Sequence, residues 1–175
     1  FMVKAFPGSN YFGTDDMPPI DYLILTHDHY DHLDFKTIRG LKKKIRAVFC
    51  SLGVGAHLRY WGIDGGIITE MDWWQNEELN DNIVLTAAPA RHFSGRGLKR
   101  GQSLWSSFIL RTATHQLYLG GDSGYDSHFM EIGEKFGPFD LAILESGQYN
   151  SMWPLIHMMP EETVQAALDL KAKAM

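Results

Sequence analysis

Four side chains that bind transition metals stand together at residues 27–32, directly after a short apolar run. The run is DYLILT, and the four residues are His27, His29, Asp31 and His32. A short apolar run bounded by turn residues is typical of a buried strand, and a turn at its end can direct all four side chains toward one point. Imidazole suits zinc, iron, copper and nickel, whereas magnesium and calcium prefer oxygen. The cluster therefore predicts a dinuclear metal site at the end of a strand.

The composition limits the classes of protein to which this chain can belong. Its 175 residues, 45% of them hydrophobic, suit one domain with a buried core. The formal net charge of −5 argues against a nucleic-acid partner, because the phosphates of nucleic acids bind positively charged protein surfaces. Cys50 is the only cysteine, so neither an internal disulfide nor a thiolate cluster can form. With no apolar run near the roughly 20 residues of a transmembrane segment, we expect a soluble cytoplasmic protein, and an oligomer is compatible with the sequence.

Strands and helices are predicted to alternate along the chain. The first half contains a predicted strand at residues 21–26, a helix at 35–44 after Asp34, a strand at 46–50, a short helix at 54–62 and a strand at 66–70. The second half contains predicted strands at 82–90, 104–112 and 115–121, a helix at 127–137, a strand at 139–146 and a helix at 161–175. The pattern indicates an α/β fold.

Three further segments place a metal-ligand type after an apolar strand. His92 follows IVLTAAPA, Asp122 follows LYLGG, and His157 comes some way after LAILES. In sheets flanked by helices, functional sites form where strand ends converge. A lone histidine is more often a surface or hydrogen-bonded core residue, but agreement among several strand ends favours one shared site.

These residues carry a family resemblance. The segments THDHYDHLD, PARHFSGRG, SLWSSF, GDSGYD, EKFGPFDLAIL and HMMPEE resemble, in order, the metallo-β-lactamase superfamily, in particular its branch around the N-acyl-phosphatidylethanolamine-hydrolysing phospholipase D. The resemblance implies an αββα four-layer sandwich formed by one domain over residues 1–175. It also implies that His27, His29 and His92 hold one metal ion, that Asp31 and His32 hold a second, and that Asp122 bridges both. The expected metal is zinc, with manganese or iron as alternatives.

The function implied by the resemblance is metal-dependent hydrolysis. A metal-bound hydroxide would attack a phosphodiester, including a lipid phosphodiester, so the expected partner is a small-molecule or lipid-like substrate. Asp31 would orient the hydroxide, and His157 would have a catalytic role beside the metals, with a role as replacement ligand as the alternative. Two rivals are a lactone or amide hydrolase on the same scaffold and a non-hydrolytic member that binds iron or another metal.

The match to the branch is incomplete at both ends of the chain. Relatives carry strands before the first motif, yet only 26 residues precede His27. They also take the last ligand of the second metal from a His-Trp-Gly segment, whereas this chain stops at Met175. We therefore expect an incomplete sandwich, a fragment of a longer protein, whose second metal site lacks one ligand within this chain.

Three residues near the motifs are candidates for substrate binding. Arg91 and Arg96 flank His92 and could hold a phosphate or carboxylate through paired donors, although loop arginines are usually only solvated. Trp153 precedes His157 and could line an apolar pocket, although tryptophans more often pack in a core.

Overall fold

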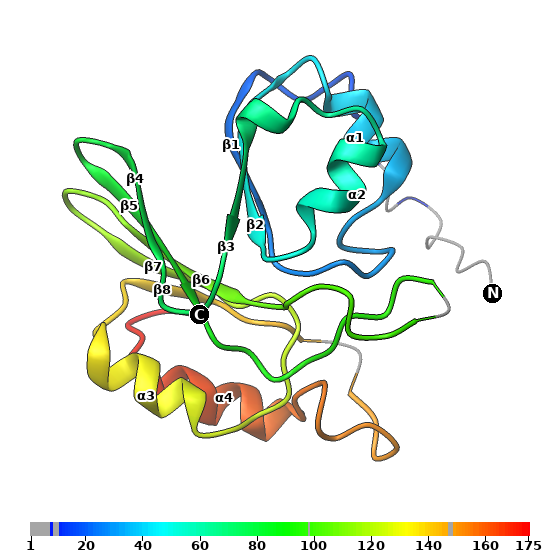
Figure 1. Ribbon diagram of the computed structural model, residues 1–175. Helices are drawn as coiled ribbons and strands as arrows, with labels where there is room; N and C mark the ends of the chain where they lie inside the picture. Colours follow the sequence, from blue (N-terminus) through cyan, green and yellow to red (C-terminus); the bar gives the residue numbers. More distant parts are fainter. Residues whose placement is uncertain (1–7, 9–10, 98, 147–148) are drawn as a thin grey trace.

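The computed structural model describes residue 8 and residues 11–97, 99–146 and 149–175. Two β-sheets face each other, and a pair of helices covers the outer side of each sheet (Figure 1). This arrangement is the αββα four-layer sandwich predicted from the sequence. Among the described residues, no helix has the length and apolar character needed to cross a membrane.

The first sheet is parallel and has three strands. They are β1 (Ile20–Leu25), β2 (Ile45–Ser51) and β3 (Ile68–Met71). Parallel neighbours require crossover connections, which here are α1 (Phe35–Leu41) and α2 (Gly55–Tyr60), with a 3-10 turn at Gly65–Ile67 before β3. The carboxylate of Asp34 accepts a hydrogen bond from the Thr37 amide at 2.7 Å, so Asp34 is the N-terminal cap of α1.

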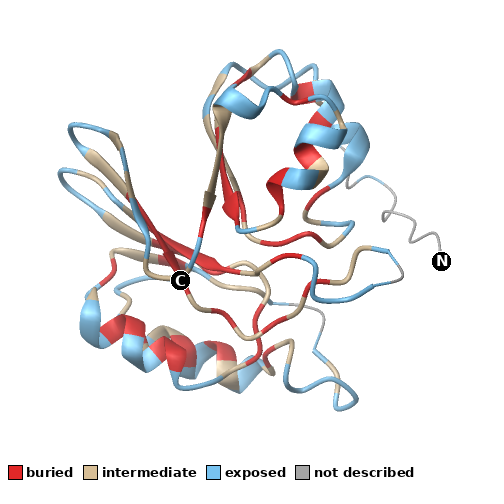
Figure 2. Ribbon diagram, in the orientation of Figure 1, coloured by how far each residue is buried: buried red, intermediate tan, exposed pale blue. Residues whose placement is uncertain are grey.

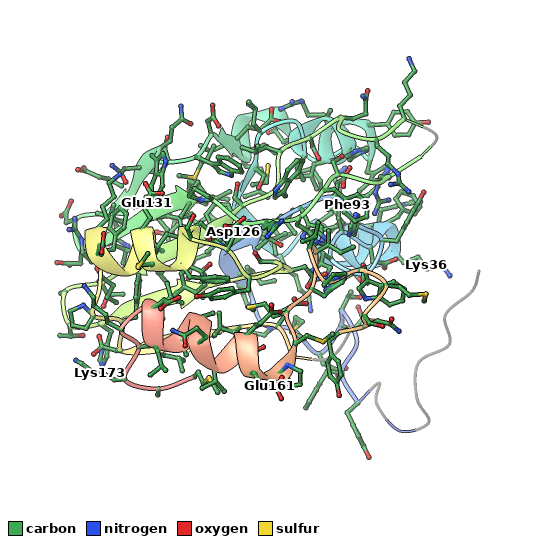
Figure 3. All side chains as sticks on the ribbon, turned by 90° about the horizontal axis from the view of Figure 1, so that it is seen from below. Lys36, Phe93, Asp126, Glu131, Glu161 and Lys173 are labelled. Carbon is green, nitrogen blue, oxygen red and sulfur yellow. The ribbon has the colours of Figure 1, made fainter. Side chains whose placement is uncertain are left out.

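The second sheet has five strands. They are β4 (Asn76–Asn80), β5 (Ile83–Ala88), β6 (Ser107–Arg111), β7 (Gln116–Leu119) and β8 (Leu141–Ile143). The first four pair antiparallel in chain order, and β8 pairs parallel to β7. Strands β6 and β7 form a hairpin, at whose turn the Thr112 amide donates to the His115 carbonyl at 2.8 Å. Helices α3 (His128–Lys135) and α4 (Pro160–Asp169) lie side by side across the outer face of this sheet (Figures 1 and 3).

Three apolar layers hold the sandwich together. The buried residues that form them are red in Figure 2. Between the two sheets, buried side chains interdigitate from Phe49, Met71, Leu85, Ala87 and Phe108. A second layer lies between the first sheet and its helices, and it includes Cys50, which is fully buried in β2. A third lies between the five-stranded sheet and α3 and α4. Burial of these layers is the main favourable contribution to folding.

Several elements differ from the sequence-based prediction. Helix α1 ends at Leu41 and not at residue 44, and β8 covers only Leu141–Ile143 of the strand predicted at 139–146. Strand β4 was not predicted, because its sequence NEELN is polar and its residues alternate only between exposed and half-buried. The final helix was predicted to reach residue 175 but ends at Asp169. Lys171 adopts a positive φ of 56°, and the chain then runs beside β8, where the Ala142 amide donates to the Ala174 carbonyl at 2.9 Å. These backbone contacts outweigh the helix propensity of the alanines and lysines that follow.

Within the layer between the sheets, Phe108 is the fully buried aromatic residue, and we expect it to make the largest contribution to the free energy of unfolding. Phe108 has 0% exposure, so replacing it with alanine leaves a cavity and should cost about 3–5 kcal/mol. Urea unfolding of Phe108→Ala and wild type measures this difference. Tyr60, 88% exposed, supplies the control, because Tyr60→Ala should change stability by less than about 0.5 kcal/mol. Equal effects of the two substitutions would contradict the packing described here.

Candidate metal centre

The predicted ligands come from loops at one end of the two facing sheets. The segment His27–His32 follows β1 of the three-stranded sheet, while His92 follows β5 and Asp122 follows β7 of the five-stranded sheet. Phe93, the neighbour of His92, lies far from Glu131 and Lys173 at the other end of the molecule (Figure 3). The sandwich thus brings together residues that the sequence separates.

Four of the predicted ligands form a compact group. His27, His29, His92 and Asp122 each offer one ligand atom, and these atoms all lie within 4.8 Å of one another. The Nε2 atom of His92 is 3.1 Å from Nδ1 of His29. The Oδ2 atom of Asp122 is 3.9 Å from Nε2 of both His27 and His92. The predicted first-metal ligands and the predicted bridging carboxylate therefore share one site.

The hydrogen bonds of this group suit a bound metal ion. Nε2 of His27 is buried and has no hydrogen-bond partner among the described residues, while its Nδ1 pairs with the Thr26 hydroxyl at 3.0 Å. Nδ1 of His92 donates to the Ile156 carbonyl at 3.0 Å, so Nε2 is the nitrogen left for the centre. An unpaired buried nitrogen is costly, and a metal ion would satisfy it. Three imidazoles and a carboxylate are a donor set that zinc accepts.

Burial keeps the imidazoles of this group neutral. It lowers the pKa of His27 to about 2 and that of His92 to about 4, with neighbouring histidines acting in the same direction. Burial alone would raise the pKa of Asp122, but the hydrogen bond from His32 and the surrounding imidazoles lower it to about 2. At neutral pH the group therefore presents unprotonated nitrogens and an ionised carboxylate, which are the forms that bind metals.

The predicted second-metal ligands lie on the solvent side of Asp122. Nε2 of His32 is 3.1 Å from Oδ2 of Asp122, and this hydrogen bond raises the pKa of His32. The Asp31 side chain is 73% exposed, with Oδ2 3.9 Å from Nε2 of His32. Asp122 therefore lies within 3.9 Å of members of both predicted sets of ligands.

A second group around Asp122 contains a residue that the sequence analysis missed. Asp122, Glu145 and His157 also offer ligand atoms within 4.8 Å of one another. Oε2 of Glu145 is 2.6 Å from Nδ1 of His157, and its Oε1 accepts from the Met158 amide at 2.7 Å. Glu145 stands just after β8, so a carboxylate at a strand end was the signal that could have identified it.

The two arginines predicted to bind substrate have protein partners. Arg91 donates to the Tyr125 carbonyl at 3.1 Å and pairs with Asp126 at 3.2 Å. Arg96 donates to the carbonyls of Asp28 and Leu33. A substrate role for either arginine stays a prediction, as it does for Trp153, which is 36% exposed in the loop before His157.

An αββα sandwich with histidines and aspartates gathered at one end of its sheets defines the metallo-β-lactamase class of folds. A family model described as the beta-lactamase superfamily domain matches residues 5–175, and the chain belongs to this family.

Two curated relatives and one solved structure illustrate the membership. An uncharacterised protein of Mycobacterium tuberculosis is 48% identical over 155 residues, which are 88% of this chain and 41% of the relative. An N-acyl-phosphatidylethanolamine-hydrolysing phospholipase D of Caenorhabditis elegans is 36% identical over 172 residues, 91% of this chain and 48% of the relative. The chain therefore spans less than half the length of either relative. Igni18, a metallo hydrolase from Ignicoccus hospitalis, shares the fold with a TM-score of 0.71 at 18% identity, over 89% of this chain and 61% of its own.

The buried histidines should make the metal-free protein sensitive to acid. Unfolded histidine titrates near 6.5, whereas folded His27 has a pKa of about 2. Between these values the unfolded state binds a proton that the folded state does not, so stability falls as the pH falls below 6.5. We expect the unfolding temperature of the metal-free protein to decrease between about pH 7 and about pH 4.5, and to decrease less in His27→Asn. An equal decrease in both proteins would contradict the neutral state of His27.

Proposed function

We propose that this chain forms the metal-binding part of a hydrolase that cleaves phosphodiesters, including lipid phosphodiesters. The observation that carries the proposal is the group of His27, His29, His92 and Asp122, whose ligand atoms lie within 4.8 Å of one another. One zinc ion would be held by His27, His29 and His92, and a second by Asp31 and His32. Asp122 would bind both ions. Two such ions lower the pKa of a shared water and stabilise the anionic oxygens of the transition state.

Asp31 is proposed to orient the attacking water. Its side chain is 73% exposed, and its carboxylate is 3.9 Å from Nε2 of His32. An ionised carboxylate accepts hydrogen bonds only, so it can fix the direction of a water proton without donating to the electrophile.

His157 is proposed to supply the proton that the leaving oxygen needs. Glu145 holds Nδ1 of the ring at 2.6 Å and is itself anchored by the Met158 amide, so the ring is fixed and Nε2 is left for proton exchange. The ring centroid lies 5.3 Å from that of His92, which places the imidazole beside the metal ligands. General acid catalysis requires such a positioned donor near the leaving group.

The preference for a lipid phosphodiester is supported by the Caenorhabditis elegans relative and by the surface beside His157. The relative is named as a phospholipase D that hydrolyses N-acyl-phosphatidylethanolamine. In the loop before His157, the side chains of Tyr149, Met152 and Leu155 are 51%, 75% and 56% exposed. Exposed apolar side chains beside a polar centre suit a substrate with both an acyl chain and a phosphate.

The metal and the reaction can be tested together. We expect elemental analysis to find two zinc ions per chain and a chromogenic phosphodiester to be hydrolysed. His29→Ala should abolish hydrolysis because it removes a ligand, whereas His115→Ala, at an exposed turn, should hydrolyse as wild type does. Hydrolysis of a lactone or amide in place of the phosphodiester would favour the first rival. One iron ion per chain with no hydrolysis would refute the proposal.

The proposed role of Glu145 predicts a specific kinetic change. Glu145→Gln removes the carboxylate that holds His157, so kcat should fall on the order of 100-fold while KM and zinc content stay constant. Steady-state kinetics and zinc analysis of the variant measure both quantities. Loss of one zinc ion in the variant would instead identify Glu145 as a metal ligand.

A further inference from the structure

The carboxylate of Asp28 is buried between two metal-ligand loops. Asp28 stands between His27 and His29 in the sequence and has 0% exposure. Its Oδ2 accepts a hydrogen bond from the Ser94 hydroxyl at 2.8 Å, and its Oδ1 accepts one from the Gly95 amide at 3.1 Å. Burying a carboxylate is costly unless it is hydrogen-bonded, and these donors come from the loop that carries His92.

Arg96 extends the same connection along the backbone. Its Nε donates to the Asp28 carbonyl at 2.8 Å, and its Nη2 donates to the carbonyl of Leu33. The guanidinium also lies over the Tyr30 ring, 4.2 Å from its centroid, which adds a cation–π attraction. Hydrogen bonds therefore join residues 94–96 to both Asp28 and Leu33, which lie at either end of the segment with the candidate ligands His29, Asp31 and His32.

The segment held in this way packs against a predicted metal ligand. A Cβ atom added to Gly95 would lie 2.8 Å from Cε2 of Phe93 and 2.9 Å from Nε2 of His29, so the Gly95 backbone lies directly against both rings. The Phe93 ring contacts the same imidazole, with centroids 4.6 Å apart. The opposite nitrogen of His29, Nδ1, faces Nε2 of His92 at 3.1 Å. Gly95 and Phe93 thus support the His29 ring on its Nε2 side, while Nδ1 faces the candidate metal centre.

We propose that Asp28 is a positioning residue of the metal centre. Its carboxylate holds Ser94 and Gly95 so that Gly95 supports the His29 ring and directs Nδ1 toward His92 and Asp122. The inference rests on the metal centre of the proposed function, but it concerns metal binding and not the substrate. Groups that orient a metal ligand commonly raise metal affinity or activity about 10- to 100-fold.

Zinc affinity can separate this role from a purely structural one. Asp28→Asn removes one acceptor and the charge, and Gly95→Ala adds a methyl group against His29 and the Phe93 ring that contacts it, without removing a hydrogen bond. The matched control is Glu70→Gln, because Glu70 also accepts from two backbone amides, Gly53 at 2.7 Å and Gly55 at 3.1 Å, but these belong to no ligand loop. Competition with a chromophoric chelator gives the affinity, and the visible spectrum of the Co²⁺ form reports the ligand geometry.

The expected result is a 10- to 100-fold loss of zinc affinity and an altered Co²⁺ spectrum in Asp28→Asn and Gly95→Ala, with wild-type values in Glu70→Gln. Thermal unfolding of the metal-free variants records any loss of stability separately. If Asp28→Asn does not fold, Gly95→Ala decides the question.

The proposal is overturned if both site variants keep the zinc affinity and the Co²⁺ spectrum of the wild type. A lowered unfolding temperature, as in Glu70→Gln, would then show that Asp28 and Gly95 contribute to stability alone. Zinc binding by the wild type without any hydrolysis would refute the proposed function alone, because the positioning role is measured by metal binding.

Discussion

The position of Asp122 is the constraint on which the candidate centre depends. Its Oδ2 atom lies 3.1 Å from Nε2 of His32 and 3.9 Å from the corresponding atoms of His27 and His92. His27 and His32 follow a strand of one sheet, whereas His92 and Asp122 follow strands of the other. The distances therefore require the two sheets to keep a fixed separation. The apolar side chains between the sheets, with Phe49 and Phe108 among them, maintain that separation.

Much of the fold could be predicted because most strands are buried and therefore apolar. The run DYLILT became β1, and the predicted crossover helices became α1 and α2. Strand β4 could not be predicted, because four of its five residues are polar and Leu79 alone packs against the core between the sheets, so the strand depends largely on its hydrogen bonds to β5. The end of α4 at Asp169 depends on backbone contacts with β8, and no local pattern encodes such contacts.

The same distinction applies to the centre. His27, His29, His92 and Asp122 could be identified because each is a ligand type that follows an apolar strand. The roles proposed for Asp28 and Glu145 rest on partners that only the folded chain brings near. These partners are Ser94 and Gly95 for Asp28 and His157 for Glu145. The arginines show the converse. A substrate role for Arg96 stays a prediction, but the sequence could not show that its guanidinium donates to two backbone carbonyls.

Cys50 gives this molecule an internal reporter. The residue is fully buried in β2, and burial raises the pKa of its thiol to about 12, so at neutral pH it is protonated and inaccessible to alkylating reagents. Because it is the only cysteine in the chain, the rate of its alkylation follows the opening of the three-stranded sheet and of the helices packed on it. The loop that carries four of the candidate ligands, His27, His29, Asp31 and His32, leaves this sheet directly after β1, which pairs with β2 at Leu25 and Cys50. Thiol labelling with and without added metal can therefore show how strongly a metal ion at one end of the sandwich restrains the sheet behind it.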